Sequence, residues 1–228
     1  MRISGIVKSS LVDFPDLISC VFFVPGCNYN CFYCHNRPLL DGTKEEITPE
    51  YVEDFLDKRA GFLDGAVISG GEPTLQPDLI PFIKSVKARG YKIKLDTNGS
   101  APQVVRQLLG SNLCDYYAVD YKAPADRYKE ICGPEADAGR VQETIKLLLD
   151  HKIPFEVRTT VIPQLSETDL LQMSEEFPPV PKYVLNRYKK PETFLSSDRL
   201  KVEQPPYTQA ETDSFADLIR IRQPHVMT

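Results

Sequence analysis

Three cysteines lie within eight residues of this 228-residue chain, at Cys27, Cys31 and Cys34. They follow an apolar run and a Pro25-Gly26 turn, so the loop that carries them can fold back and bring three thiolates to one centre. A structural zinc ion takes four protein ligands, and an electron-transfer 4Fe–4S cluster takes four cysteines. Three thiolates therefore predict a 4Fe–4S cluster with one iron open to a small ligand.

A structural zinc site or a plain redox cluster is the alternative. The fourth ligand would then come from His35, Cys114 or Cys132. His35 directly follows Cys34, which makes joint ligation of one ion awkward, and neither remote cysteine stands in a ligand-like spacing. Cys132 has two interpretations of its own, as a catalytic thiol in a loop or as a small buried residue, and the second is favoured.

Four other polar segments follow apolar runs further along the chain. They are Ser69-Gly70-Gly71-Glu72-Pro73, Asp96-Thr97-Asn98-Gly99, Asp120-Tyr121-Lys122 and Arg158-Thr159-Thr160. Each has an ordinary structural interpretation, as a tight glycine turn, an Asx turn, a solvated strand end or a surface ion pair. The segments also have chemical interpretations. The pair Gly70-Gly71 would let a ligand approach the backbone, and the oxygens of Asp96, Thr97 and Asp120 suit a hard cation. Lys122 suits a ligand carboxylate.

The elements that position these segments alternate along the chain from Ile18 onward. Apolar, β-branched runs predict strands at Ile18–Val24, Ala66–Ser69, Lys92–Leu95, Tyr116–Val119, Phe155–Val161 and Tyr183–Leu185. Amphipathic stretches predict helices at Pro49–Arg59, Pro77–Arg89, Pro102–Leu109, Arg140–His151, Glu167–Glu176 and Thr208–Arg222. Helix-start chemistry supports several of these boundaries, with Thr48 before Pro49 and Ser166 three residues before Asp169.

Repeated strand–helix units require parallel strand pairing with right-handed crossovers. The sheet then either opens as a doubly wound fold or curls into a barrel. Six units fall short of the eight in a closed barrel. An incomplete (βα)6 barrel over residues 1–188 is therefore expected, with residues 189–228 as a C-terminal extension of the same α/β domain. The open side of such a barrel would admit a large substrate.

Composition narrows the range of partners. Apolar residues make up 42% of the chain, which is ordinary for a globular protein. The net charge of −5 disfavours binding to the phosphates of a nucleic acid. No apolar run approaches the roughly 18 residues of a membrane span. The N-terminal residues also lack a secretory signal, so a cytoplasmic protein is expected.

An aromatic residue, Tyr33, precedes the third cysteine, and C-x3-C-x2-C in this form resembles the signature of the radical S-adenosylmethionine superfamily. The resemblance implies that the methionine moiety chelates the open iron through its amino and carboxylate groups. One electron from the cluster then breaks the sulfonium S–C5′ bond, and the resulting 5′-deoxyadenosyl radical takes hydrogen from a substrate. It also implies cofactor contacts from Tyr33 and Asn36, with core packing as the alternative for Tyr33.

The later segments resemble those of the glycyl-radical-enzyme activating enzymes, a branch of this superfamily. Gly70-Gly71-Glu72 resembles the loop that binds the methionine amino group, and Lys122 the lysine that reaches the carboxylate. The resemblance implies cofactor contacts from Gly70, Gly71, Glu72, Asp96, Asn98, Lys122 and Arg158. It implies that a monovalent cation, sodium or potassium, is held by Asp96, Thr97 and Asp120.

The resemblance extends from about Gly5 to Pro163 and is strongest to the activating proteins of anaerobic ribonucleoside-triphosphate reductases. It implies an oxidoreductase that abstracts a glycine Cα hydrogen from a glycyl radical enzyme, with a flavodoxin or ferredoxin as electron donor. The chain has no tryptophan, although many relatives carry one soon after the cluster. A radical enzyme acting on a small molecule or peptide is the alternative, followed by a non-enzymatic zinc or iron–sulfur protein.

Overall fold

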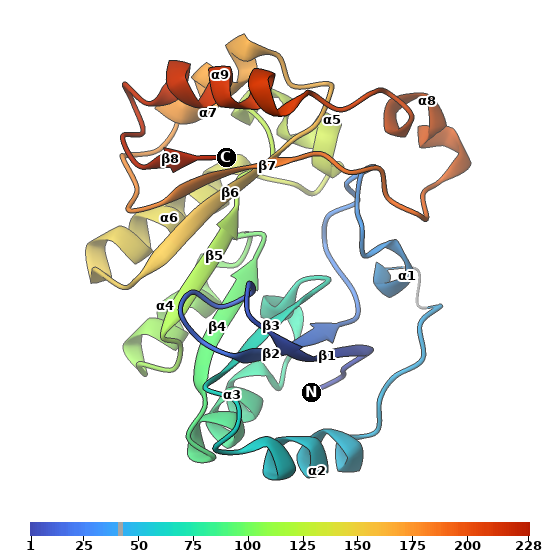
Figure 1. The fold of residues 1–228 in the computed structure, drawn as a ribbon, viewed down its shortest axis with the longest axis vertical. Coiled ribbons are helices and arrows are strands. Elements are labelled where there is room, and N and C mark those ends of the chain that lie inside the picture. Colours follow the sequence, from blue (N-terminus) through green and yellow to red (C-terminus); the bar gives the residue numbers. More distant parts are fainter. Residues whose placement is uncertain (41–42) are drawn as a thin grey trace. The chain divides into compact units, whose positions relative to one another are not determined.

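The structure, a computed structural model, describes residues 1–40 and 43–228. Its strands are β1 (Gly5–Ser10), β2 (Ser19–Val24), β3 (Gly65–Gly70), β4 (Lys92–Thr97), β5 (Tyr116–Asp120), β6 (Phe155–Val161), β7 (Tyr183–Arg187) and β8 (Val226–Met227). Its helices are α1 (Arg37–Leu40), α2 (Pro49–Arg59), α3 (Leu79–Ala88), α4 (Pro102–Gly110), α5 (Tyr128–Cys132), α6 (Ala138–His151), α7 (Glu167–Glu175), α8 (Arg199–Val202) and α9 (Gln209–Ile219). Three 3-10 turns occur at Pro73–Leu75, Ala125–Arg127 and Ser196–Asp198. Figure 1 shows the course of these elements.

The described residues form one eight-stranded sheet with the strands in chain order, β1 to β8. The pairs β2/β3, β3/β4, β6/β7 and β7/β8 are parallel, and β1 pairs with β2 in antiparallel fashion. All six predicted strands are present. The sequence missed β1, whose Lys8 and Ser9 are exposed and break the apolar signal, and β8, which has only two residues.

Residue contacts gather in two compact units. The first comprises Met1–Cys27, Pro38–Thr97 and Gln103–Ala118, and the second comprises Asn28–Arg37, Asn98–Pro102 and Val119–Thr228. Residues 189–228, which were expected to extend the barrel, lie within the second unit. The expectation of a single domain stays a prediction.

Helices α2 and α3 cover one face of the parallel strands in the first unit. Helix α2 begins where predicted because the Thr48 hydroxyl accepts a hydrogen bond from the Tyr51 amide and Pro49 occupies the first turn. Its buried face reaches the sheet through Phe55, whose ring meets Phe22 edge-on at 6.1 Å, and Phe82 of α3 meets the same ring at 5.6 Å. The other face of the strands buries a separate apolar cluster around Phe14, Val21 and Val67.

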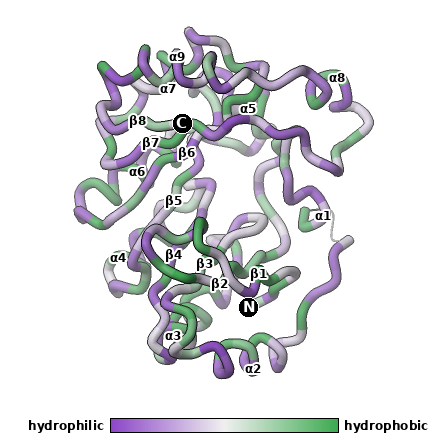
Figure 2. The backbone as a smooth tube through the Cα atoms, viewed as in Figure 1, coloured by the Kyte–Doolittle hydropathy of each residue, from purple (hydrophilic) through white to green (hydrophobic). Residues whose placement is uncertain are grey.

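Helices α7 and α9 lie side by side in the second unit (Figure 1). Both begin with reciprocal capping boxes, Ser166 with Asp169 and Thr208 with Glu211. Hydrophilic and hydrophobic residues succeed one another along α9 (Figure 2), and its buried residues include Phe215. The capping signal predicted at Ser166 therefore marks a true helix start, and the Thr208 box was not predicted.

Three short helices, α1, α5 and α8, were not predicted, because four or five residues show no measurable periodicity. The predicted helix at Pro77–Arg89 is shorter in the structure, where α3 runs from Leu79 to Ala88. No helix among the described residues is both long and apolar enough to cross a bilayer.

Candidate functional site

The second unit contains residues 28–37, which carry Cys31 and Cys34 and are here named the cluster loop. Its backbone is held from the end of α5, where the Asn30 amide donates to the Cys132 carbonyl at 2.8 Å. Gly133 lies under the same residue with φ of +100°, and a Cβ there would stand 3.3 Å from the Asn30 nitrogen. The loop is therefore fitted against a glycine that tolerates this backbone conformation.

A buried arginine braces the cluster loop from within. Arg37 is only 3% exposed, and its guanidinium donates to the Asn30 side-chain oxygen at 2.6 Å and to the Cys31 carbonyl at 3.3 Å. Sequence reasoning missed Arg37, although its position three residues after Cys34 was visible. The guanidinium group carries several N–H donors in a fixed plane, so it can hold Asn30 and Cys31 at the same time.

The side-chain amide of Asn98 also hydrogen-bonds to the cluster loop. Its nitrogen donates to the Asn28 side-chain oxygen at 2.9 Å, and the Asn28 nitrogen donates to the Ser100 hydroxyl at 3.0 Å. The Asn98 oxygen in turn accepts from the Ser100 amide at 2.9 Å. Asn98, expected as a cofactor contact, thus has a structural role in holding the loop that carries two of the three cysteines.

The thiols of the second unit differ in acidity. A hydrogen bond from Cys132 lowers the pKa of Cys31 and outweighs the effect of burial. Burial raises the pKa of Cys34, partly opposed by the backbone amide of Asn36, which donates to its sulfur. Burial also raises the pKa of Cys132 well above its usual range. Cys132, for which the sequence favoured a small buried residue over a catalytic thiol, is buried and donates to Cys31.

Tyr33 is 5% exposed and packs its ring against Phe32 with the centroids 5.2 Å apart. Its hydroxyl is buried and makes no hydrogen bond to any described residue. Burying a hydroxyl without a hydrogen-bond partner costs free energy. The Tyr33 hydroxyl is therefore available to hydrogen-bond a polar ligand. His35, the adjacent zinc-ligand candidate, is exposed.

Cys27 belongs to the first unit, where the Gly70-Gly71 turn positions the backbone before it. The Gly71 amide donates to the Val24 carbonyl and the Glu72 amide to the Gly26 carbonyl, both at 2.8 Å. A Cβ on Gly71 would stand 1.9 Å from the Gly26 oxygen, and Gly70 has φ of +114°. Both glycines are required for this close approach, which explains the glycine pair without a ligand.

The carboxylate of Glu72 is fully buried. One of its oxygens accepts from the Thr74 amide at 3.0 Å, the Thr74 hydroxyl at 2.6 Å and the Thr97 hydroxyl at 2.7 Å. These bonds tie the β3 loop to the end of β4. A contact from Glu72 to a ligand ammonium, and a cation contact from Thr97, stay predictions.

Asp96 already has a protein cation in the first unit. The Lys94 ammonium stands 3.0 Å from one carboxylate oxygen, and the Ser69 hydroxyl donates to the other at 3.2 Å. Lys94 is 2% exposed, and its ammonium also donates to the Asp13 carbonyl at 2.7 Å. Sequence reasoning missed Lys94, although residues 94 and 96 point to one face of a strand.

Asp120 has two protein cations in the second unit. Lys122 donates to one carboxylate oxygen at 2.9 Å and Arg158 to the other at 3.0 Å. Burial alone would raise the pKa of Asp120, but these two charges and their hydrogen bonds lower it to about 2. Asp120, Lys122 and Arg158 therefore lie in contact, and their predicted roles toward a cofactor stay predictions.

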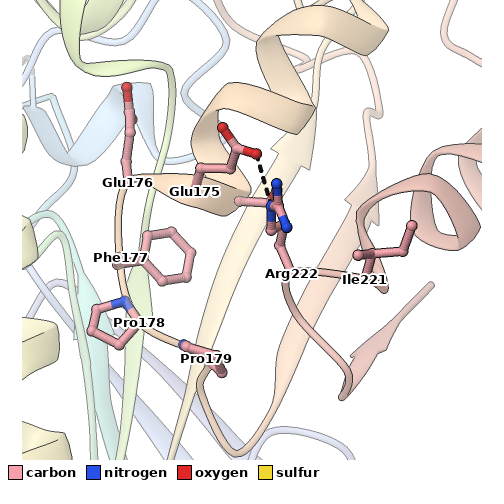
Figure 3. Close-up of a pocket in the computed structure, with 8 residues that line it drawn as sticks. Glu175, Glu176, Phe177, Pro178, Pro179, Ile221 and Arg222 are labelled. Atoms are coloured by element: carbon pink, nitrogen blue, oxygen red, sulfur yellow. Dashed lines mark hydrogen bonds and ion pairs between the residues drawn. The ribbon is translucent and has the colours of Figure 1, made fainter.

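A surface cavity of about 690 Å³ lies elsewhere in the second unit, between the end of α7 and the segment after α9. Figure 3 shows Glu175 paired with Arg222 at this cavity, which Phe177, Pro178 and Ile221 also line. The Arg222 guanidinium stands 2.8 Å from the Glu175 carboxylate. None of the predicted site residues lines this cavity.

Among the described residues, no three histidine, cysteine or acidic side chains are gathered around a single metal position. The case for a cluster therefore depends on the donor set and on kinship. Residues 21–177, more than half of the chain, match the family described as the Radical SAM superfamily. The chain belongs to this superfamily, and it is a radical SAM enzyme.

Individual relatives agree with this assignment. The chain is 35% identical over 198 residues, 84% of its length, to a protein of Methanocaldococcus jannaschii named as a candidate glycyl-radical enzyme activating enzyme, 82% of which is covered. The fold matches Streptococcus suis SuiB with TM-score 0.66 at 15% identity, over 87% of this chain and 44% of that chain. It also matches a domain of pyruvate-formate lyase-activating enzyme from Bacteroides vulgatus with TM-score 0.54 at 15% identity, over 69% and 94%. These two structures confirm the predicted fold class, a partial α/β barrel of the radical SAM type.

The family implies a 4Fe–4S cluster and S-adenosylmethionine, and the residues present fit both groups. Three cysteine thiolates are soft ligands suited to iron–sulfur clusters. The buried Tyr33 hydroxyl lacks a protein partner among the described residues. The Asp120, Lys122 and Arg158 side chains carry two positive charges and one negative, which suits a ligand carboxylate.

Proposed function

We propose that this chain activates a glycyl radical enzyme, with an anaerobic ribonucleoside-triphosphate reductase as its target. The observation that carries this proposal is the similarity to the Methanocaldococcus jannaschii protein, which extends over 84% of this chain and 82% of that protein. Similarity along nearly the whole of both chains supports a shared activity better than a match confined to the cofactor-binding segments.

Cys27, Cys31 and Cys34 would hold the cluster, and the arrangement around them keeps their loop in one conformation. Arg37 and Gly133 fix the cluster loop, and the Gly70-Gly71 turn fixes the backbone before Cys27. A rigid support matters because displacing a functional side chain by about 1 Å can greatly lower the rate of the reaction it supports.

Asn36, Gly70, Gly71, Asp96, Lys122 and Arg158 are proposed as contacts of S-adenosylmethionine, together with Tyr33, Glu72 and Asn98. Lys122 and Arg158 would bind its carboxylate. Both side chains are positively charged and share one carboxylate, that of Asp120, so the three side chains together carry a positive charge that attracts an anion. When bound, the cluster and S-adenosylmethionine together supply a radical that removes hydrogen from the target glycine. A flavodoxin or ferredoxin is proposed as the electron donor.

The experiment is to mix the reduced, cluster-loaded protein with S-adenosylmethionine and the candidate reductase under anaerobic conditions. Electron paramagnetic resonance should show a glycyl doublet, and a matched sample of Cys31→Ser should show none. If wild type cleaves S-adenosylmethionine but gives no doublet with any glycyl radical enzyme, the target is a small molecule or peptide instead. The monovalent cation expected at Asp96, Thr97 and Asp120 is not part of this proposal.

A further inference from the structure

Lys94 is the least expected charged residue in the first unit. It is 2% exposed on β4, and lysine is almost never buried unless it is paired. The β4 sequence Lys92-Ile93-Lys94-Leu95-Asp96-Thr97 places residues 94 and 96 on one face and residues 93 and 95 on the other, against the helices. The side chain is thus directed to the same face as a carboxylate that was expected to bind a metal ion.

The ammonium of Lys94 is held in place on several sides. It stands 3.0 Å from Asp96 and donates to the Asp13 carbonyl at 2.7 Å, and it lies 5.9 Å from the centre of the Tyr116 ring. A buried charge with a counter-charge, a carbonyl acceptor and an aromatic ring nearby is stabilised in one position. Lys94 is therefore a resident cation of the Asp96 carboxylate.

The other carboxylate, Asp120, has two resident positive charges. Asp120, in the second unit, is contacted by both Lys122 at 2.9 Å and Arg158 at 3.0 Å. Two positive charges beside one carboxylate disfavour a further cation and favour an anion. Both carboxylates that were expected to bind sodium or potassium are therefore already neutralised by side chains of this chain.

We propose that Lys94 supplies the positive charge at Asp96 that was expected from a monovalent cation, so that this chain binds S-adenosylmethionine without sodium or potassium. Lys94 is then a positioning residue, because it acts through Asp96 and keeps that carboxylate fixed and neutralised. The inference rests on the cofactor binding in the proposed function but is independent of the identity of the target.

The test measures S-adenosylmethionine affinity on the anaerobic, cluster-loaded protein by equilibrium dialysis. One buffer contains potassium chloride and the other contains tetramethylammonium chloride at the same ionic strength, since that cation is too large for a protein metal site. Wild-type affinity should be equal in the two buffers within about twofold. A wild-type affinity that falls about tenfold or more without potassium would overturn the proposal.

Three variants extend the test. Lys94→Met should weaken binding about tenfold in tetramethylammonium buffer, and potassium should restore a large part of the loss by entering the vacated position. Lys94→Arg keeps a charge and should stay independent of potassium. Lys92→Met removes an exposed lysine from the same strand and should behave as wild type. A Lys94→Met protein that folds, by circular dichroism, and shows no response to potassium would contradict a charge role for Lys94.

The outcomes separate this inference from the proposed function. Potassium-dependent binding together with an intact glycyl doublet would overturn only the role of Lys94. A missing doublet together with potassium-independent binding would overturn only the proposed target. Absence of S-adenosylmethionine binding in either buffer would overturn both.

Discussion

At the scale of single residues, the cysteine motif depends on a thiol outside it. Cys132 is fully buried at the end of α5 and donates a hydrogen bond to Cys31. The backbone carbonyl of Cys132 accepts a hydrogen bond from the Asn30 amide. Cys132 therefore contacts both the backbone of the cluster loop and the side chain of Cys31. Burial raises the pKa of Cys132, which favours its protonated thiol form.

Iron content distinguishes a ligand from a supporting thiol. Cys31→Ser should lose most of the iron, because a serine hydroxyl is a poor substitute for a thiolate ligand of iron. Cys132→Ser should retain about four irons per chain, the content of one cubane. Iron and sulfide are measured after anaerobic reconstitution. Loss of the cluster in Cys132→Ser to the same degree as in Cys31→Ser would instead make Cys132 a fourth ligand.

Asp120 should make stability depend on acid pH. Its pKa is about 2 in the folded protein, because Lys122 and Arg158 favour the charged form despite burial, against about 3.9 in the unfolded chain. A depressed folded-state pKa contributes stability that is fully present above about pH 4 and is lost as the pH falls towards about 2. The stability difference between wild type and Asp120→Asn should therefore shrink over this interval.

Urea unfolding of both proteins at several pH values measures this difference. Asp150→Asn, which removes an exposed carboxylate from α6 of the same unit, controls for a general change in surface charge. A difference that stays constant from neutral pH down to about pH 2 would contradict the assigned pairing.

At the scale of elements, the turn after β3 is shaped by contact between backbones. Gly71 lies so close to Gly26 that an alanine Cβ would stand 1.9 Å from the Gly26 oxygen. Gly71→Ala should therefore displace the segment before Cys27, cost about 1–3 kcal/mol of unfolding free energy and lower the iron content.

Gly110→Ala is the matched control, because a Cβ at this α4 position meets nothing within 4 Å. It should leave iron content unchanged and alter stability by less than about 1 kcal/mol. Iron analysis and urea unfolding of the two alanine variants make the comparison. Equal effects of the two substitutions would show that the turn does not position Cys27.

At the scale of the whole molecule, the C-terminal residues complete the second unit. Strand β8 pairs with β7, and Gln223 is 1% exposed between α7 and the loop after it. Its amide nitrogen donates to the Ser174 carbonyl at 3.0 Å, and its oxygen accepts from the Val180 amide at 3.1 Å. The extension predicted from the sequence is therefore packed into the fold.

Gln223→Ala should destabilise the protein by about 1–3 kcal/mol, because buried partners on both sides lose their hydrogen bonds. The midpoint of urea unfolding reports the change. Glu192→Ala, at an exposed position of the same segment, should have little effect. A Gln223→Ala midpoint equal to that of wild type would show that the C-terminal segment contributes little to the stability of the second unit.

Several features could be predicted from local sequence alone. Strand β6 and helix α2 have the predicted ends, since alternation and capping are properties of neighbouring residues. The number and spacing of the three cysteines favour a 4Fe–4S cluster over a zinc site, and membership of the radical SAM superfamily supports that cluster. The sequence places Asp120 and Arg158 at the ends of two strands, and the hydrogen bond between them is seen only in the structure.

The sequence by itself placed six strands and six helices in order along the chain, and it marked three cysteines whose number and spacing favour a 4Fe–4S cluster. Only the tertiary structure decided that Lys94 lies against Asp96, that Arg37 braces the loop and that Cys132 contacts Cys31. The physical reason is that these contacts depend on register, burial and side-chain direction, which arise when distant segments pack. A buried lysine and a solvated one look alike in a sequence, and only the packed structure shows that the Lys94 ammonium is buried beside Asp96.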